Sequence, residues 1–397
     1  MNKVLLIDDD PMMGELMSPV LNELGLNDVT YANDGDKALE WVDNGRELPS
    51  LILCDLRMPG MDGIRFLRHL SERNYDGDIV IMSGSNSRLL ETVYDLGIAR
   101  QLRIRGALEK PITRNALAKV LNGSPRVKPV RKDEPQLSLT SEDLARGLRA
   151  GEFITHFQPK VDINTRQIDG VETLVRWYHK DVGLIPPDRF IPMAERSRII
   201  DDLTETVFYQ ALRNAAAWKK LGHEIPVAVN VSVHNLQRLD LPDWLLSTAK
   251  SLGVEPQMIT IEVTESRLME NLADALEILT RLSLQGVNLS IDDFGTGYAS
   301  MDQLRRIPFN ELKIDRSFVS RAQYDTAAMA ILESSVDLGK KLGMTLVAEG
   351  VESRSQWQLV ERLGCHKVQG FYVSKAMNGS DIPEWLEVWD KTRKFWH

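Results

Sequence analysis

The sequence predicts an α/β protein with two domains, a doubly wound parallel sheet followed by a (β/α)8-type barrel. The chain has 397 residues, more than the roughly 150 residues of an average domain, so two or three domains are expected. Short apolar runs alternate with amphipathic segments, which is typical of parallel sheets covered by helices. This alternation stops at residues 123–138, where prolines stand among charged residues, and then restarts. The segment therefore predicts a linker.

The first domain, residues 1–122, contains short apolar runs that are separated by helical patterns. The expected strands cover residues 4–8, 28–32, 51–55, 78–84 and 106–110, and two of the helices cover residues 11–24 and 63–73. Because strands and helices alternate along the chain, we expect a parallel sheet with helices on both of its faces.

The second domain, residues 139–397, continues the alternation over a longer stretch. Thr140 and Asp143 fit a capping box at the start of a helix that ends at Arg149. Strands are expected at residues 153–163, 168–177, 227–232, 258–265, 287–293, 310–315, 344–349 and 367–370, with helices at 271–285 and 326–342. Strands in this number, mostly separated by helices, predict a (β/α)8-type barrel.

Charge and composition exclude several classes of protein. The net charge of -9 and the pI near 5.4 argue against binding to nucleic-acid polymers or anionic membranes, because a polyanion would meet a repulsive field. No apolar stretch approaches the roughly 18 residues that a membrane span needs. We therefore expect no membrane insertion, and we expect a cytoplasmic location. Cys54 and Cys365 form no CxxC pattern and are expected as buried, reduced thiols.

Three aspartates in the first domain predict a site at one edge of its sheet. Asp8 and Asp9 close the first strand and Asp55 closes another, and the carboxyl ends of parallel strands lie along one edge. Three converging carboxylates require a divalent cation or protonation. Ser83 and Lys110 fall at the ends of two further strands. Such a set suits acceptance of a phosphoryl group by Asp55, while the hydroxyl and the ammonium hold the product oxygens.

This pattern resembles the receiver domain of bacterial two-component response regulators, a flavodoxin-like domain. The resemblance implies a cognate histidine kinase as the partner. The sequence departs from the family at Ala107, where Tyr or Phe is usual, so the output surface is expected to work differently. By the resemblance, the phospho-acceptor is Asp55, the Mg2+-binding pair is Asp8 and Asp9, the switch hydroxyl is Ser83, and the invariant lysine is Lys110.

Polar residues recur near the ends of the expected barrel strands and predict a second site. They are Glu172, Asn230, Glu262, Asp292, Asp293, Lys313, Glu349 and Gln369. Neighbouring barrel strands would bring them to one mouth. So many carboxylates would repel one another unless metal screens them, and an all-oxygen set favours Mg2+ or Mn2+. Two ions bridged by one carboxylate would activate water and hold a phosphodiester oxygen.

The stretch SIDDFGTGYAS, residues 290–300, carries two of these carboxylates side by side. Neighbouring side chains of a strand point to opposite faces, so Asp292 and Asp293 can share a site only where the strand ends and the chain turns. Gly295 and Gly297 follow at once, as suits a turn of the chain at this point.

The second domain resembles the EAL family of cyclic di-GMP phosphodiesterases over about residues 140 to 390. The motifs that carry the resemblance follow in family order: FQPK (157–160), ETL (172–174), LVRW (174–177), VNVS (229–232), IEVTES (261–266), DDFGTGY (292–298), LKID (312–315), AEGVE (348–352) and QG (369–370). The resemblance implies a TIM-like barrel that hydrolyses cyclic di-GMP to linear pGpG with two metal ions.

Residue roles are implied by the same resemblance. It makes the stretch 290–300 a mobile loop, whose two glycines would let the backbone bend over the substrate and metals. The metal ligands would be Glu172, Asn230, Glu262, Asp292, Asp293 and Glu349, the catalytic residues would be Glu349, Lys313 and the loop anchor Glu265, and the substrate-binding residues would be Gln158, Leu174, Arg176, Asp315 and Gln369. Thr173 replaces the family alanine, and strand alternation should point it away from the face of Glu172.

Other interpretations stay open at this level. Taken singly, Arg176 could stack on Trp177, and Asn230 could cap a turn. The whole domain could be a catalytically silent sensor that binds the dinucleotide or a partner protein, although no metal ligand or loop glycine is missing. A cyclase is disfavoured because no GGDEF-type segment occurs. The family resemblance also implies a homo-oligomer, a dimer or a larger assembly.

Overall fold

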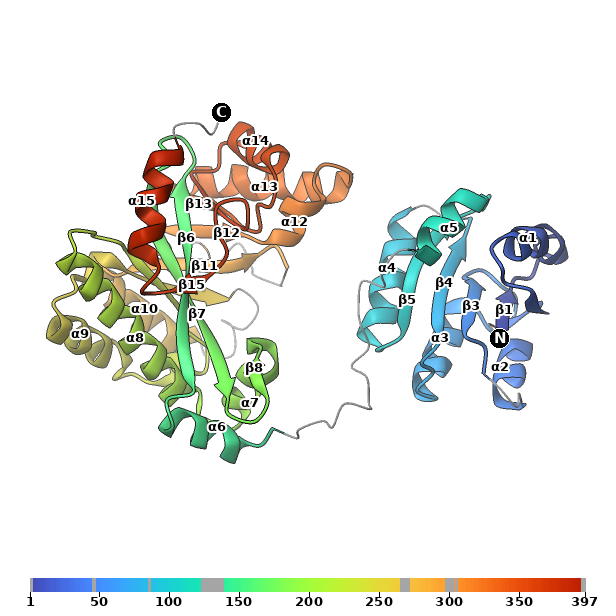
Figure 1. Ribbon diagram of the computed structural model, residues 1–397, viewed down its shortest axis with the longest axis horizontal. Coiled ribbons are helices and arrows are strands. Elements are labelled where there is room, and N and C mark those ends of the chain that lie inside the picture. The colour runs from blue at the N-terminus through green and yellow to red at the C-terminus, as the bar shows by residue number, and fades with distance from the viewer. Residues whose placement is uncertain are drawn as a thin grey trace. The chain divides into compact units, whose positions relative to one another are not determined.

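A computed structural model of the chain describes residues 3–44, 48–84, 87–122, 139–264, 272–296, 304 and 306–393. The chain divides into two compact units, Met1–Leu137 and Ser138–His397, and each unit is described by itself (Figure 1). The predicted linker, residues 123–138, lies outside the described residues.

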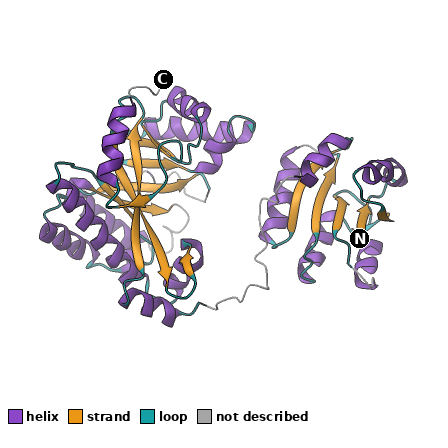
Figure 2. Ribbon diagram, in the orientation of Figure 1, coloured by secondary structure: helices purple, strands orange, loops and turns teal. Residues whose placement is uncertain are grey.

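The first unit is a parallel five-stranded sheet in the order β2-β1-β3-β4-β5, the flavodoxin-like order that the sequence predicts. Its strands are β1 (Lys3–Ile7), β2 (Asp28–Ala32), β3 (Leu51–Asp55), β4 (Asp78–Ser83) and β5 (Arg103–Glu109), and its helices are α1 (Pro11–Glu23), α2 (Gly35–Asn44), α3 (Gly63–Glu72), α4 (Ser87–Ala99) and α5 (Arg114–Asn122). In Figure 2 helices flank both faces of this sheet.

The apolar strands of the first unit serve two cores, one on each face of the sheet. In β1, Leu5 and Ile7 belong to one buried cluster, whereas Val4 and Leu6 belong to the other. Successive side chains of a strand alternate between faces, so a strand buried on both faces must be apolar throughout.

The second unit is a closed eight-stranded barrel with two accessory strands. The barrel strands are β6 (Phe153–Asp162), β7 (Ile168–His179), β9 (Val227–Asn230), β10 (Ile259–Thr264), β11 (Asn288–Phe294), β12 (Glu311–Ile314), β13 (Thr345–Ala348) and β14 (Lys367–Gln369), and the accessory strands are β8 (Gly183–Ile185) and β15 (Met377–Asn378). β6 pairs with both β7 and β14 and so closes the ring.

One strand breaks the all-parallel pattern of a (β/α)8 barrel. β6 runs antiparallel to both of its barrel neighbours, while the other barrel pairs are parallel. The physical reason is the connection between β6 and β7, residues 163–167, which is too short for the crossover that two parallel strands need. The chain instead makes a hairpin there.

Helices surround the barrel and bury a continuous apolar core against it. They are α6 (Ser141–Arg149), α7 (Pro187–Arg196), α8 (Ile200–Lys220), α9 (Leu241–Leu252), α10 (Leu272–Leu284), α12 (Arg316–Arg321), α13 (Thr326–Lys341), α14 (Arg354–Leu363) and α15 (Ile382–Thr392). The predicted capping box is confirmed at α6, where Thr140 Oγ1 accepts from Asp143 N at 3.2 Å and Asp143 Oδ2 accepts from Thr140 N at 3.0 Å.

The two cysteines are as the sequence predicts. Cys54 and Cys365 are buried and free.

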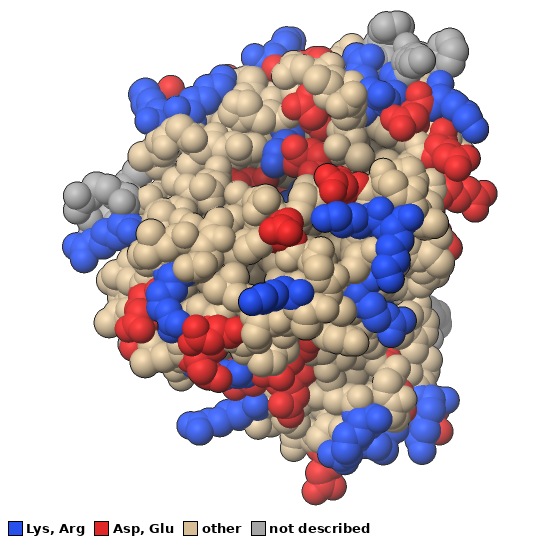
Figure 3. All heavy atoms as spheres, turned by 90° about the vertical axis from the view of Figure 1, so that its left-hand side faces the viewer, with Lys and Arg blue, Asp and Glu red and all other residues tan. Residues whose placement is uncertain are grey.

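On the face drawn in Figure 3, basic and acidic side chains are interspersed over uncharged surface, so no single sign of charge covers that face. Within the described part of the chain, no helix combines the length and the apolar character that crossing a bilayer requires.

Candidate functional site

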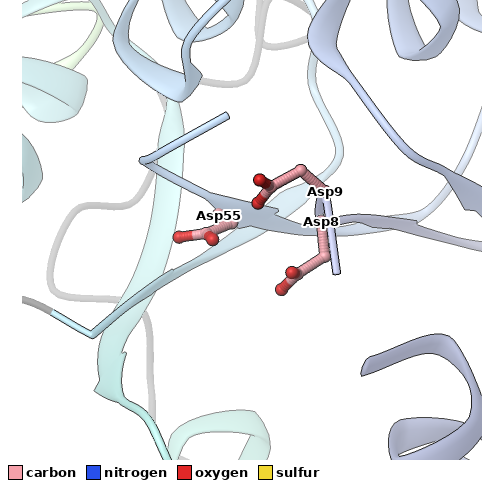
Figure 4. A group of neighbouring side chains, drawn as sticks. All are labelled: Asp8, Asp9 and Asp55. Carbon is pink, nitrogen blue, oxygen red and sulfur yellow. The ribbon is translucent and has the colours of Figure 1, made fainter. Parts of the chain in front are cut away.

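Three carboxylates meet at one edge of the first unit, as the sequence predicts. Asp8 and Asp9 directly follow β1, Asp55 ends β3, and β1 and β3 are parallel neighbours (Figure 4). One oxygen from each of the three carboxylates lies within 4.8 Å of the others. Asp8 and Asp55 are buried, while Asp9 is exposed, so the group opens to solvent through Asp9. Hard oxygen ligands of this kind suit Mg2+.

Lys110 bridges two of these carboxylates. Its Nζ lies 2.7 Å from Oδ2 of Asp8 and 2.7 Å from Oδ2 of Asp55. Burial alone would lower the pKa of Lys110, but its hydrogen bonds to Asp55 and Asp8 raise it. Burial also raises the pKa of Asp8, against the effect of Lys110. The ammonium is therefore held charged beside the expected acceptor, Asp55.

The loop after β3 brings backbone donors to Asp55. Oδ1 of Asp55 accepts hydrogen bonds from Leu56 N at 2.7 Å and from Arg57 N at 3.3 Å. Gly63 begins α3 against this loop, and a Cβ at Gly63 would lie 2.3 Å from the Asp55 carbonyl oxygen. The glycine is thus required by the close approach of helix and strand end. Ser83 ends the neighbouring strand β4 and is buried.

The buried ammonium of Lys313, on β12, is the centre of a cluster of carboxylates inside the barrel. Its Nζ lies 2.7 Å from Glu349 Oε1, 3.0 Å from Glu262 Oε2, 3.0 Å from Asp292 Oδ1 and 3.4 Å from Glu172 Oε2. Burial opposes the charge, but the surrounding carboxylates raise the pKa of Lys313 well above its usual value. The cluster joins residues from β7, β10, β11 and β12 with the residue that follows β13.

The carboxylates form two overlapping groups. Glu172, Glu262 and Asp292 bring oxygens within 4.8 Å of one another, and so do Asp292, Asp293 and Glu349. Asp292 belongs to both groups, which is the arrangement needed for a carboxylate that bridges two ions. The first group is buried, whereas the second is more open at Asp293 and Glu349; both groups could hold metal.

The electrostatics of the cluster favour added cations. Burial and nearby negative charge raise the pKa of Glu262 to about 7, that of Asp293 to about 6, and that of Glu349 well above its usual value. Each raised pKa means that the charged form of the carboxylate is disfavoured, even though Lys313 lies at the centre of the cluster and attracts it. Divalent cations would remove the repulsion, so the donor set fits the metal that the sequence predicts.

Two amides orient the carboxylate of Glu172. Asn230 Nδ2 donates to its Oε1 at 2.9 Å, and Gln369 Nε2 donates to its Oε2 at 2.5 Å and to Gln158 Oε1 at 3.2 Å. Because the Asn230 nitrogen faces a carboxylate, its Oδ1 is the atom available to a cation. The buried Oε1 of Gln369 has no hydrogen-bond partner among the described residues, so it can serve a bound water or ligand.

The adjacent aspartates lie near the end of their strand, as expected, but a bulge is what brings them together. In β11, Ile291 pairs with Leu312 and Phe294 pairs with Ile314. The two intervening residues of β11 thus oppose a single residue of β12, and Asp293 has φ 55°. A bulge breaks the alternation of side chains, so both carboxylates reach one site.

The glycine after the bulge has the left-handed backbone that only glycine adopts readily. Gly295 has φ 95°, and a Cβ there would lie 2.9 Å from Cε2 of Phe318. Gly297 and the rest of the expected mobile loop lie outside the described residues, as does Glu265.

A cavity of about 250 Å³ reaches the carboxylate cluster through Asn230, which lines it and is hydrogen-bonded to Glu172. Leu174 and Arg176 line it together with Asn230, and so does Thr173, which therefore faces this cavity. The expected substrate residues Leu174 and Arg176 thus share one hollow with an expected metal ligand. Trp177 is buried and stacks on Phe153 with ring centroids 4.9 Å apart, in place of the stacking on Arg176 considered above.

One residue lies elsewhere than a simple strand-end pattern predicts, and another has a second contact. Glu172 is in the interior of β7, because β7 continues past it to pair with β8. The carboxylate of Asp315 caps α12, accepting hydrogen bonds from Ser317 N at 2.9 Å and from the Ser317 hydroxyl. The structure thus gives Asp315 a structural partner as well as a place near the mouth.

Sequence analysis missed two buried charges next to the site. Lys160 is the last residue of FQPK, and Glu311 stands just before LKID. Both are buried, and Lys160 Nζ contacts Glu262 and Glu311 at 3.2 Å each. The available signal was a lysine directly before Val161 in the predicted strand 153–163, since buried lysine is rare unless it is paired.

Comparison with known families identifies this arrangement. The EAL domain family matches residues 141–376, which is more than half of the chain. The chain belongs to the EAL family. The response regulator receiver domain matches residues 4–122, so this EAL protein also carries a receiver domain.

Relatives share all or part of this EAL architecture. Cyclic di-GMP phosphodiesterase RocR of Pseudomonas aeruginosa is 31% identical over 379 residues, which cover 94% of this chain and 96% of RocR. Bifunctional diguanylate cyclase/cyclic di-GMP phosphodiesterase MucR of the same species is 40% identical over 250 residues, covering 63% of this chain and 36% of MucR. The similarity to RocR therefore extends over both units.

Solved EAL structures agree with the barrel. The MucR phosphodiesterase in complex with c-di-GMP has a TM-score of 0.59 and 39% identity, covering 61% of this chain and 98% of that chain. An EAL domain protein from Listeria monocytogenes has a TM-score of 0.56 and 26% identity, covering 64% of this chain and 99% of that chain. The predicted fold of the second unit is confirmed.

Proposed function

We propose that this EAL protein is a cyclic di-GMP phosphodiesterase that opens its substrate to linear pGpG. The observation that carries the proposal is the pair of carboxylate groups that share Asp292, with Lys313 between them. RocR and MucR, which are similar to this chain, are named as cyclic di-GMP phosphodiesterases, and this supports the same substrate here.

Two Mg2+ or Mn2+ ions would be held in the barrel. The expected ligands are Glu172, Asn230, Glu262, Asp292, Asp293 and Glu349. They are the members of the two overlapping carboxylate groups together with Asn230. When bound, such ions lower the pKa of water and neutralise charge that develops on the phosphodiester.

Lys313 and Glu349 would act on the attacking water. Their side chains are hydrogen-bonded to each other at 2.7 Å, so both can reach one small molecule beside Asp292. The ammonium would orient the water and the reacting phosphate, and the carboxylate would accept the water proton. The water oxygen bonds to phosphorus, one ester P–O bond breaks, and a proton goes to the leaving oxygen.

Substrate binding is assigned to the residues around the mouth. Arg176 would face a phosphate of the dianionic substrate, and Leu174 would contact a base in the cavity. Gln158 and Gln369 are hydrogen-bonded to each other next to Glu172 and would hold the substrate close to the cluster. Asp315 and the loop anchor Glu265 complete the proposed site.

Control by phosphorylation of Asp55 is proposed for the receiver unit. Asp8 and Asp9 would hold one Mg2+, Lys110 would bind the phosphoryl oxygens, and Ser83 would act as the switch. A histidine kinase would supply the phosphoryl group. We assign residues 1–122 to this domain, 123–138 to the linker and 139–397 to the barrel, and propose a homo-oligomer; the cytoplasmic location stays a prediction.

Product analysis tests the proposal. Purified protein is mixed with cyclic di-GMP and Mg2+, with and without acetyl phosphate, and products are separated by chromatography. Linear pGpG is expected from the unaltered chain and not from Glu172→Ala. A response to acetyl phosphate that disappears in Asp55→Asn would support receiver control. Binding of cyclic di-GMP without any product would support the silent-sensor alternative instead.

A further inference from the structure

A buried lysine links the proposed metal site to a chain of charges that runs away from it. Lys160 is 3% exposed, and its Nζ lies 3.2 Å from Oε1 of Glu262 and 3.2 Å from Oε1 of Glu311. The carboxylates raise the pKa of Lys160 although burial opposes this, so the residue is an ammonium. Lys160 is the second cation that touches Glu262, after Lys313.

The charges alternate in sign from the barrel surface to its centre. Lys367 Nζ lies 2.6 Å from Asp169 Oδ2 and 2.8 Å from Glu311 Oε2. Lys160 then joins Glu311 to Glu262, whose other oxygen faces Lys313 at 3.0 Å. In order, the chain is Asp169, Lys367, Glu311, Lys160, Glu262 and Lys313.

Strand pairing explains how Lys160 reaches this position. In β6 it is two residues from Gln158 and therefore on the same face, and it pairs with Gln369 of β14. Gly170 of β7 stands opposite Lys160 and brings no side chain to that face. The long lysine side chain thus extends within the barrel to β10 and β12.

We propose that Lys160 is a positioning residue for Glu262. Its hydrogen bond occupies Oε1 and turns Oε2 toward Lys313 and Asp292, where the metal would be bound. Lys313 cannot do this alone, because it also serves Glu172, Asp292 and Glu349. The inference rests on the metal site of the proposed function, and it concerns the geometry of a ligand rather than the chemistry performed there.

Glu311 alone does not account for Lys160. Lys367 already lies 2.8 Å from Glu311, so that carboxylate has a cation without Lys160. Of the two lysines, Lys160 contacts Glu262, and no contact between Lys367 and Glu262 occurs among the described residues. Lys367 therefore provides a matched control: it is a partly buried lysine of the same charge chain, one step farther from the site.

Direct binding of Mn2+ tests the proposal. Calorimetry with Mn2+ alone is carried out on the full-length chain and on the variants Lys160→Met and Lys367→Met. Removing a side chain that orients a metal ligand typically costs about 10- to 100-fold in metal affinity. We expect Lys160→Met to bind Mn2+ at least about 10-fold more weakly, Lys367→Met to stay within about two-fold, and Lys160→Arg to recover part of the loss.

Activity provides a second measurement. The Mn2+ concentration for half-maximal pGpG release should rise in Lys160→Met, while KM for cyclic di-GMP at saturating Mn2+ should not change. Unaltered Mn2+ binding in Lys160→Met, or an equal loss in Lys367→Met, would overturn the proposal. If no chain releases pGpG but the Mn2+ binding pattern holds, the proposed function fails while the positioning role stands.

Folding is controlled with a double variant. Lys160→Met leaves Glu311 and Glu262 with one fewer cation and can destabilise the barrel. Lys160→Met combined with Glu311→Gln removes one charge of each sign, and circular dichroism reports whether it folds. Weak Mn2+ binding by the folded double variant supports the proposal, and binding equal to that of the unaltered chain contradicts it.

Discussion

The Nζ atom of Lys313 lies 2.7 Å from Oε1 of Glu349 inside the barrel, and the same ammonium contacts three further carboxylates. This one cation stands between the two carboxylate groups that share Asp292. Under the proposed function, a lysine in this position would have two roles that can be separated: it would act on the substrate, and it would hold the cluster together when metal is scarce.

Replacement of Lys313 by Met is expected to lower kcat by roughly 100-fold or more, as for loss of one charged donor at a reacting centre. Without Mg2+ the variant should also lose roughly 3 kcal/mol or more of unfolding free energy, because the buried carboxylates lose their shared partner. Added Mg2+ should restore much of that stability but not kcat. Steady-state kinetics and urea unfolding with and without Mg2+ measure both effects.

Lys341→Met is the control for this variant. Lys341 is exposed and pairs with Asp337 one turn away, so its loss should change neither measurement appreciably. Turnover by Lys313→Met close to that of the unaltered chain would contradict the assigned role.

Replacement of Gly295 by Ala should impair catalysis, whereas replacement of Gly286 should not. Both glycines have positive φ, 95° and 86°, so alanine should cost about 1 kcal/mol of stability at either position. The two positions differ in their surroundings. At Gly295, two residues after Asp293, the new Cβ would lie 2.9 Å from Cε2 of Phe318, whereas at Gly286 it would meet no atom within 4 Å. We expect a lower kcat for Gly295→Ala alone; equal kinetics for the two variants would count against a role for this turn.

Acid should destabilise the barrel through Glu311. Burial opposes its charge, but Lys160 and Lys367 lower its pKa from 4.5 to about 2. A carboxylate whose pKa is lowered in the folded state stabilises the fold above its unfolded pKa and loses this contribution as the pH falls toward the folded pKa. The contribution, about 3 kcal/mol, should therefore disappear between pH 4.5 and about 2.

Urea unfolding as a function of pH measures this dependence. Every tryptophan except Trp41 lies beyond residue 138, so tryptophan fluorescence mainly follows the barrel. Glu311→Gln should be less stable at pH 6, since two lysines lose a partner, and its stability should fall less steeply below pH 4.5. Parallel pH profiles for the variant and the unaltered chain would refute the prediction.

The receiver site predicts different effects for two neighbouring aspartates. Asp9→Asn should raise the Mg2+ concentration needed for phosphorylation by acetyl phosphate, because Asp9 belongs to the carboxylate group with Asp8 and Asp55. Asp10→Ala should leave that concentration unchanged but lower stability by about 1 kcal/mol, because Asp10 caps α1 through Met12 N at 3.0 Å. Two measurements distinguish the roles: phosphorylation as a function of Mg2+ concentration, and thermal unfolding. If the effects of the two variants were interchanged, the prediction would be contradicted.

Much of the fold could be predicted because local patterns and fold rules agree. Apolar runs such as residues 51–55 indicated strands buried on both faces, and Thr140 with Asp143 indicated a helix start; the structure confirms both. The antiparallel β6 could not be read from apolar periodicity, because strand direction depends on the connection, here the short segment 163–167.

The residues that form the site were easier to predict from the sequence than their arrangement in space. Carboxylates near successive strand ends indicated one common mouth, and the structure brings Glu172, Glu262, Asp292 and Glu349 around Lys313. The sequence could not reveal the bulge at Asp293, since extra residues in a strand depend on register with its neighbour.

By itself, the sequence determined that there are two α/β domains and which residue types converge at each, because these follow from apolar periodicity and from the order of motifs. The tertiary structure alone decided which atoms meet. Lys160 and Glu311 lie 151 residues apart, and nothing local to either residue specifies the 3.2 Å contact between them. Barrel closure through β6 brings them together, and burial of both charges makes their pairing necessary.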